Sequence, residues 1–229
     1  EAEKNVADND LTWATSPTKH EATIAASSGN ITFTDIPYYS SDVEKYSYLI
    51  GYHPSTDGTL SGNEVSYTIN GNMDIMLSTV VNGNKDSKGT TLAPKFSHKL
   101  AQLIIKITGN SGTATAEKDA SAAAAAWGDI ESIKVKDVAT NVKLNLSTKS
   151  LTASDATSTP LEIIKKDASY PAISTTTEEA GYCMILPQET AKAYILTVKT
   201  KNAEKDVTVT IPAGDGRGEN ITVAGESYV

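Results

Sequence analysis

The feature of this sequence that most limits its fold is a series of short segments in which every second residue is apolar. The clearest are Ile31–Phe33, Val65–Ile69, Val142–Leu146, Tyr194–Val198 and Val207–Ile211. Because successive side chains of a β-strand point to opposite faces, this period of two predicts strands with one buried and one solvated face. Residue pairs such as Asp57-Gly58 and Asn82-Gly83 lie between the runs and favour tight turns. The sequence therefore predicts an all-β fold.

One short helix is expected among the strands. Residues Ala116–Ala126 have the alanine-rich composition of a helix, and Gly128 follows directly where a helix would end. Elsewhere, the stretches 81–94 and 151–160 are rich in small polar residues and resemble linkers. The first has alternating runs on both sides, so we place a domain boundary near residues 88–95. This gives an N-terminal domain of residues 1–92 and a C-terminal domain of residues 93–229.

The charge balance excludes some classes of partner. The 229 residues carry a formal net charge of −8, and Arg217 is the only arginine. Polyanions are bound by neutralising phosphates with Lys and Arg, so we expect no nucleic-acid partner. No apolar run approaches the roughly 18 residues that a membrane helix needs, so we expect no membrane-spanning segment.

The residues that could carry catalysis or bind a metal are scattered. His20, His53 and His98 lie far apart, and none has the spacing of a zinc motif. Cys183 lies in an apolar run without a basic neighbour, which indicates a buried structural thiol. The glycine-rich Gly214–Gly218 precedes a strand-like run rather than a helix, so it predicts a hairpin loop and not a phosphate site. We therefore expect no enzyme activity, no metal and no cofactor.

The segment Phe96–Ile107 changes its alternation midway. Phe96, His98 and Leu100 share one parity, whereas Leu103, Ile105 and Ile107 share the other. The apolar face stays inward only if one residue is absorbed by a bulge or bend near Ala101 or Gln102. This prediction places His98 on the apolar face, as a core histidine with ring nitrogens bonded to backbone.

Several short motifs in this chain resemble those of the fimbrillin-like proteins, the exported pilus subunits of Bacteroidales. The most specific is Phe-x-His-x-Leu-Ala-x-Leu at residues 96–103, preceded by Met73-Asp-Ile-Met76. Weaker matches follow in the family's order: Ile130-x-x-Ile-Lys-Val135, Ile185-Leu-Pro-Gln188 and Ala224-Gly-x-x-Tyr228. The resemblance covers roughly residues 45–229.

The resemblance implies two transthyretin-like β-sandwich domains and a role as a structural or accessory subunit of a cell-surface fimbria that supports adhesion. It implies other subunits as partners, joined by exchange of a β-strand. It also implies export across the periplasm to the outer membrane as a lipoprotein, with the signal and lipid anchor outside this chain. The family usually continues for one or more strands past the final motif, whereas this sequence ends at Val229. Some members mature by cleavage after an N-terminal arginine, and no arginine precedes Arg217.

The resemblance points to a candidate assembly strand at the C-terminus, with Ile221, Val223, Tyr228 and Val229 as its side chains. An unpaired sheet edge is a template for a strand from another chain. The segment could instead be an ordinary core strand whose successors are the donors.

A second function stays open, that of a surface adhesin module which binds carbohydrate or a host protein without polymerising. Exposed aromatic rings can stack on sugars, and Trp13 and Tyr38-Tyr39 are candidates for this role. Trp127, beside the expected helix, is assigned to a core instead.

Overall fold

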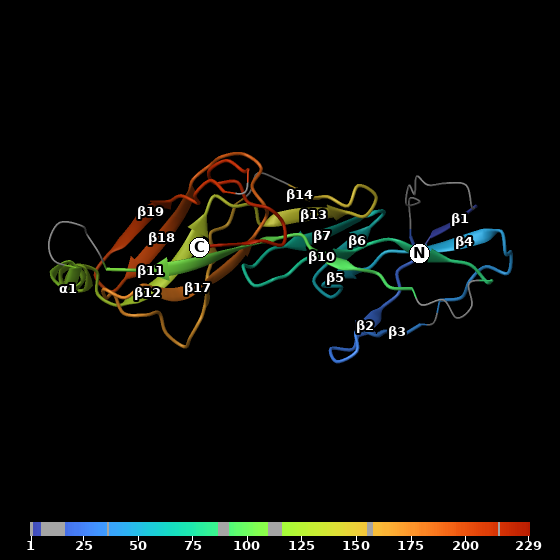
Figure 1. Ribbon diagram of the computed structural model, residues 1–229, viewed down its shortest axis with the longest axis horizontal. Helices are drawn as coiled ribbons and strands as arrows, with labels where there is room; N and C mark the ends of the chain where they lie inside the picture. The colour runs from blue at the N-terminus through green and yellow to red at the C-terminus, as the bar shows by residue number, and fades with distance from the viewer. Residues whose placement is uncertain are drawn as a thin grey trace. The chain divides into compact units, whose positions relative to one another are not determined.

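The computed structural model describes residues 2–5, 17–35, 37–86, 92–109, 116–154, 158–214 and 216–229. Within these residues, the chain is all-β with one short helix, as its alternating runs predicted (Figure 1). Contacts divide it into two compact units, each discontinuous in sequence. Unit 1 comprises Glu1–Tyr67, Ile75–Ser97 and Lys143–Leu151, and unit 2 comprises Thr68–Asp74, His98–Val142 and Thr152–Val229. The boundary expected near residues 88–95 stays a prediction.

Short strands and a hairpin account for most of unit 1. One three-stranded sheet has the order β1 (Ala2–Asn5), β4 (Lys45–Leu49), β9 (Val81–Gly83). A second has the order β10 (Phe96–His98), β8 (Met76–Ser78), β5 (Tyr52–His53). Among the described strands, β2 (Ala22–Ile24) and β3 (Ile31–Phe33) pair only with each other, and Figure 1 shows this hairpin projecting from the strands around it.

A further four-stranded sheet shows why the alternating runs form strands. Its order is β14 (Leu151–Ala153), β13 (Asn141–Asn145), β7 (Glu64–Thr68), β6 (Thr59–Ser61). The apolar residues of one parity are buried while their neighbours face water, as the period of two requires. On β7 and just after it these are Val65, Tyr67 and Ile69, and on β13 they are Val142 and Leu144.

Two four-stranded sheets make up most of unit 2. The first has the order β16 (Ile164–Lys165), β17 (Glu178–Ile185), β11 (Ala101–Ile107), β20 (Ser227–Tyr228). The second has the order β15 (Leu161–Glu162), β12 (Ile130–Lys136), β18 (Tyr194–Thr200), β19 (Glu204–Val209). The two central strands of each sheet bury alternate residues, so each sheet has one face in the core: Leu103, Cys183 and Ile185 in the first, and Ile133, Val135, Tyr194 and Leu196 in the second.

Helix α1 (Ala116–Trp127) occupies the expected position. It ends because Gly128 adopts a φ of 73°, and the Gly128 amide donates a hydrogen bond of 2.8 Å to the Ala124 carbonyl. Among the described helical residues, no segment has the length and apolar character needed to cross a membrane.

The two stretches interpreted as linkers are partly strand. Val81–Gly83 pairs with β4 and Leu151–Ala153 forms β14, so backbone pairing overrides their small polar composition. Residues 87–91 and 155–157 of these stretches lie outside the described residues. The bulge or bend predicted near Ala101 is confirmed as a break in the strand. Leu100 and Ala101 are both fully buried, and the strand is interrupted at Lys99–Leu100 between β10 and β11.

Candidate functional site

The C-terminal segment, predicted as an alternating strand, is largely irregular. Only Ser227–Tyr228 is strand, and the expectation of a strand at Ile221–Val223 is wrong. The reason is the central residue, because Thr222 is 2% exposed whereas Val223 is 38% exposed. The Thr222 hydroxyl accepts a hydrogen bond of 2.8 Å from the backbone amide of Gln188. The backbone amide of Thr222 in turn donates to the Gln188 carbonyl at 3.0 Å. A polar side chain with partners is therefore buried where alternation predicted an outward one.

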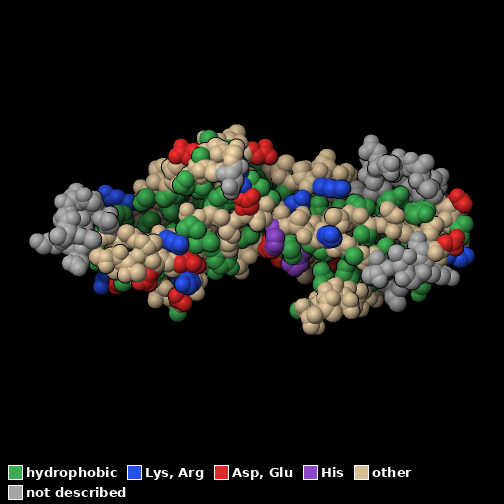
Figure 2. Space-filling model, viewed as in Figure 1, with side chains coloured by type: hydrophobic (Ala, Val, Ile, Leu, Met, Phe, Trp, Pro, Cys, Tyr) green, Lys and Arg blue, Asp and Glu red, His purple; other side chains and the backbone are tan. Residues whose placement is uncertain are grey.

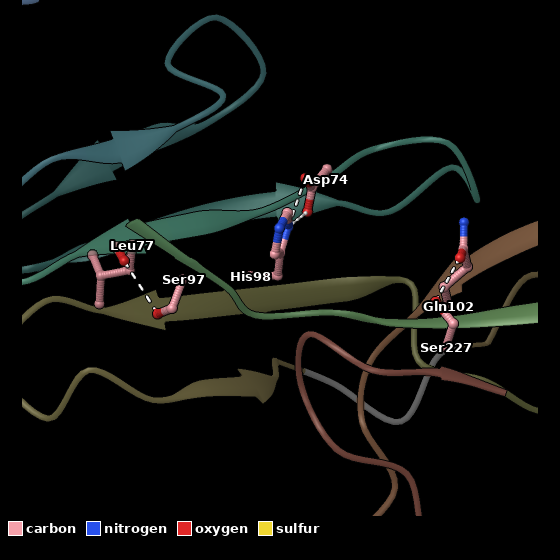
Figure 3. A network of polar contacts seen from close by, with 6 residues as sticks. All are labelled: Asp74, Leu77, Ser97, His98, Gln102 and Ser227. Carbon is pink, nitrogen blue, oxygen red and sulfur yellow. Dashed lines mark hydrogen bonds and ion pairs between the residues drawn. The ribbon is translucent and has the colours of Figure 1, made fainter. Parts of the chain in front are cut away.

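Strand β20 lies at the edge of its sheet and runs parallel to β11. The register pairs Gln102 with Ser227 and Leu103 with Tyr228. The Ser227 hydroxyl also donates a hydrogen bond of 2.7 Å to the Gln102 side chain, and these two residues are drawn in Figure 3. In the described part of the chain, residues 105–107 of β11 are paired with β17 alone. The final residue, Val229, is 66% exposed.

A cluster of side chains holds β20 in place, and we call Arg217, Val223, Glu226 and Tyr228 the C-terminal clasp. The Arg217 guanidinium pairs with the Glu226 carboxylate and lies 5.6 Å from the centre of the Tyr228 ring. The Tyr228 hydroxyl donates to Glu226 at 2.9 Å and accepts from the Val223 amide at 2.9 Å. The hydrogen bond from Tyr228, together with Arg217, lowers the pKa of Glu226. Partial burial raises the pKa of Tyr228. The clasp thus keeps the carboxylate ionised and the phenol neutral.

Asn220 supports the base of this segment. It adopts a φ of 60°, a conformation that asparagine tolerates better than most residues, and it is 6% exposed. Its side-chain oxygen accepts a hydrogen bond of 2.8 Å from the Ile211 amide, and its amide donates to the Ile211 carbonyl at 2.9 Å. The sequence did not predict that Asn220 and Ile211 anchor this segment, although an Asn after a Gly-rich loop is a signal for a positive φ.

The expectation of a core position for His98 is wrong. Its side chain is 53% exposed, and its Nδ1 lies 2.9 Å from both carboxylate oxygens of Asp74 (Figure 3). Strand β10 ends at His98, so its alternation of buried and exposed side chains does not continue into β11. The His98 ring therefore points outward. Asp74 comes from the segment before β8 and supplies a partner that sequence spacing did not reveal.

The remaining candidate residues lie apart from one another. His20 packs edge-on against Phe33, with ring centroids 6.5 Å apart, and His53 is exposed on β5. Cys183 is fully buried as predicted, and burial raises its pKa to about 12. Across the described residues, no group of three or more His, Cys, Asp and Glu side chains could hold a metal ion. On the face shown in Figure 2, acidic and basic side chains are interspersed rather than gathered by sign.

The aromatic candidates for stacking differ in exposure. Tyr38 is 82% exposed and Tyr39 is 39% exposed, on the segment that precedes β4. Trp127 is partly buried at the end of α1, and its carbonyl accepts a hydrogen bond from the Asn202 amide at 3.1 Å. Trp13 lies outside the described residues.

Comparison with known proteins gives one family and several similar solved structures. A family model described as fimbrillin-like matches residues 2–229. A crystal structure described as that of a cell adhesion protein from Bacteroides uniformis ATCC 8492 shares 16% identity and a TM-score of 0.60, over 98% of this chain and 88% of that one. This likeness shows a shared fold.

Two other solved structures, also described as cell adhesion proteins, are less similar. The one from Bacteroides ovatus ATCC 8483 has 15% identity and a TM-score of 0.45, over 79% of this chain and 64% of that one. The one from Bacteroides thetaiotaomicron VPI-5482 has 14% identity and a TM-score of 0.44, over 97% of this chain and 79% of that one. No protein with a curated description matches the sequence.

Proposed function

Since the chain belongs to the fimbrillin-like family, we propose that it is a structural or accessory subunit of a bacterial cell-surface fimbria, assembled by β-strand complementation. The observation that carries this proposal is the state of its sheet edges. Strand β20 is paired with β11 at two positions, and β1 is an edge strand paired with β4 at four. A strand at the edge of a sheet exposes backbone groups that a strand from another chain can satisfy.

The finer architecture is part of the same proposal. Residues 1–92 and 93–229 would form two transthyretin-like β-sandwich domains, supported by the one-sided burial of both sheets in unit 2. The subunit would be exported as a lipoprotein and act at the outer membrane, without enzymatic activity. Immunoelectron microscopy of native cells tests the location. Label confined to the cytoplasm would contradict it.

Strand exchange can be tested by controlling whether β1 can dissociate from β4. The register places Glu3 opposite Ser47, so the double variant Glu3→Cys, Ser47→Cys allows a disulfide between β1 and β4. Ser47 suits this change because its buried hydroxyl has no hydrogen-bond partner within the described residues. A protease site inserted between residues 16 and 17 then separates β1 from the rest of the chain.

The assay is electrophoresis in denaturant without heating. We expect the cleaved, reduced protein to form ladders of oligomers, because loss of β1 opens the edge of β4. The cleaved, oxidised protein should stay monomeric, since the disulfide retains β1. If neither this protein nor a chain extended beyond Val229 gives denaturant-resistant oligomers, polymerisation by strand donation is wrong for this subunit.

The exposure of Tyr38 favours a second candidate function, that of a carbohydrate- or host-binding adhesin that does not polymerise. A tyrosine that is 82% exposed can stack on a sugar ring. Tyr38→Ala should abolish binding to a glycan array, whereas the control Val43→Ala, at an exposed position of the same segment, should not. Binding that Tyr38→Ala leaves unchanged would exclude this surface.

A further inference from the structure

Unit 2 has a polar pocket of about 360 Å³ on the outer face of its first sheet, and we call it the outer-face pocket. The register places Gln102 beside both Met184 and Ser227, and all three residues line the pocket. Their neighbours Leu103 and Cys183 are buried on the opposite face, because side chains alternate along a strand. The pocket therefore lies on the solvated side of this sheet.

The segment that precedes β8 forms one wall of the outer-face pocket. It contributes Asn72 and Asp74 to the lining. Two hydrogen bonds fix this segment to β17. The Met184 amide donates to the Gly71 carbonyl at 2.7 Å, and the Tyr182 hydroxyl donates to the Asn72 side-chain oxygen at 2.8 Å. The wall is thus held against the sheet that forms the floor.

Two side-chain amides in the outer-face pocket have N–H groups available to a ligand. The Gln102 oxygen accepts a hydrogen bond of 2.7 Å from the Ser227 hydroxyl, and Figure 3 shows the amide nitrogen pointing away from Ser227. The Asn72 oxygen is likewise occupied by Tyr182. Within the described residues, neither amide nitrogen makes a hydrogen bond. Each amide therefore offers two N–H donors to an acceptor in the pocket.

The carboxylates of the outer-face pocket already have partners, which argues against a charged ligand. His98 Nδ1 lies 2.9 Å from both oxygens of Asp74, and Arg217 pairs with Glu226. An anionic ligand would face both carboxylates, and no Lys or Arg is among the described residues of the lining. A cationic ligand would have to compete with the existing partners. Each carboxylate can still accept a further hydrogen bond from a neutral donor.

These groups fit a neutral ligand with several hydroxyl groups. A hydroxyl both donates and accepts, so neighbouring hydroxyls can bond to a carboxylate and to an amide N–H. Leu100, Met184 and the Tyr182 ring add apolar surface, which the C–H groups of a sugar ring can contact. An apolar ligand would leave the polar groups without partners. A peptide strand pairs with a sheet edge, whereas this pocket lies on a sheet face.

We propose that the outer-face pocket binds one neutral hexose ring of a glycan, which donates to Asp74 and Glu226 and accepts from the Asn72 and Gln102 amides. The proposal gives the second candidate function a site other than Tyr38, which belongs to unit 1. It does not depend on strand exchange, because it rests on a sheet face and not on a sheet edge.

The probes for the test are the methyl glycosides of glucose, galactose and mannose, followed by saturation-transfer NMR with the intact chain. We expect saturable binding of at least one of them. The corresponding methyl glycuronide should bind more weakly, because its carboxylate faces Asp74 and Glu226. Asn72→Ala removes the amide donors and should weaken binding about fivefold, the size of one net hydrogen bond. The matched control Asn82→Ala makes the same change at an exposed position of β9 in unit 1 and should leave the affinity unchanged.

A second variant keeps the test independent of Asn72. Gln102→Met has a similar length without the amide, and it should also weaken binding about fivefold. Urea unfolding of each variant shows whether the fold is retained. Absence of saturable binding of all three glycosides would overturn the proposal. So would binding that Tyr38→Ala abolishes while Asn72→Ala and Gln102→Met leave it unchanged, because the glycan would then bind to unit 1.

Discussion

Gly181 lies in β17 opposite Lys165 of the edge strand β16, and we expect Gly181→Ala to destabilise the protein strongly. A Cβ at this position would lie 2.0 Å from the Ile164 carbonyl oxygen and 3.1 Å from the Lys165 Cα. The oxygen would have to retreat by about 1 Å to reach the shortest separation that real Cβ atoms show. Both contacts are with backbone, so no side-chain rotation relieves them.

The expected cost follows from what holds β16 in place. Moving β16 away strains its pairing with β17 and the hydrogen bond from the Lys166 amide to the Ala180 carbonyl, 3.1 Å long. Losing two such bonds costs about 1–3 kcal/mol. The neighbouring Ile163 is 3% exposed and its amide bonds to Ile133, so the strand cannot drift freely. Gly181 also has a φ of 155°, which adds about 1 kcal/mol or more for alanine.

Together these terms predict a loss of about 3 kcal/mol in the free energy of unfolding, measured by urea titration. For a chain of this size that corresponds to a fall of about 6–12 °C in Tm. The control is Gly214→Ala, because a Cβ there meets nothing within 4 Å and should cost less than about 0.5 kcal/mol. Equal stability of the two variants would refute the steric argument.

Three further predictions concern two buried residues and one residue of the C-terminal clasp. Leu144→Ala should lower the free energy of unfolding by about 2–5 kcal/mol in urea titration, because Leu144 is fully buried; a cost below about 1 kcal/mol would contradict its core position. Cys183, whose pKa is raised to about 12 by burial, should resist a thiol-specific reagent at pH 8 in the folded protein and react in urea; rapid native labelling would refute this. Glu226→Gln should be less stable than the wild type at neutral pH. Because the pKa of Glu226 is lowered from its usual 4.5, this difference should shrink as the pH falls through the lowered value, and a constant difference would exclude the clasp as its cause.

The alternating runs predicted most of the strands because burial of one sheet face fixes the register of a strand and the side to which each side chain points. A shift by one residue in β7 would expose Val65 and Tyr67 together and bury their polar neighbours. The Gly-rich and Asn-rich stretch at 81–94 misled because composition reports only local preference. Val81–Gly83 is held as a strand by pairing with β4, which lies more than thirty residues earlier in the chain.

His98 shows the limit of parity as a guide to burial. The predicted irregularity was placed correctly, at the consecutive buried residues Leu100 and Ala101. Parity could not predict that β10 ends at His98. Beyond the end of a strand, the alternation of its side chains no longer determines to which side the following side chains point. Nor could parity supply Asp74, a partner brought within 2.9 Å by the fold and separated by twenty-four positions in sequence.

The C-terminal segment failed as a predicted strand for a related reason. Alternation treats threonine as an outward residue, yet Thr222 is buried because Gln188 and Tyr194 supply hydrogen-bond partners for its hydroxyl. The segment is therefore held mainly by polar contacts and by two backbone pairs at β20, with little apolar burial of its own. Hydrogen bonds exchange for water at small net cost, whereas buried apolar surface does not. Strand β20 should consequently open more readily than β17, which shares its sheet but carries the buried Cys183 and Ile185. An edge that opens at low cost is the property that exchange of a strand between subunits requires.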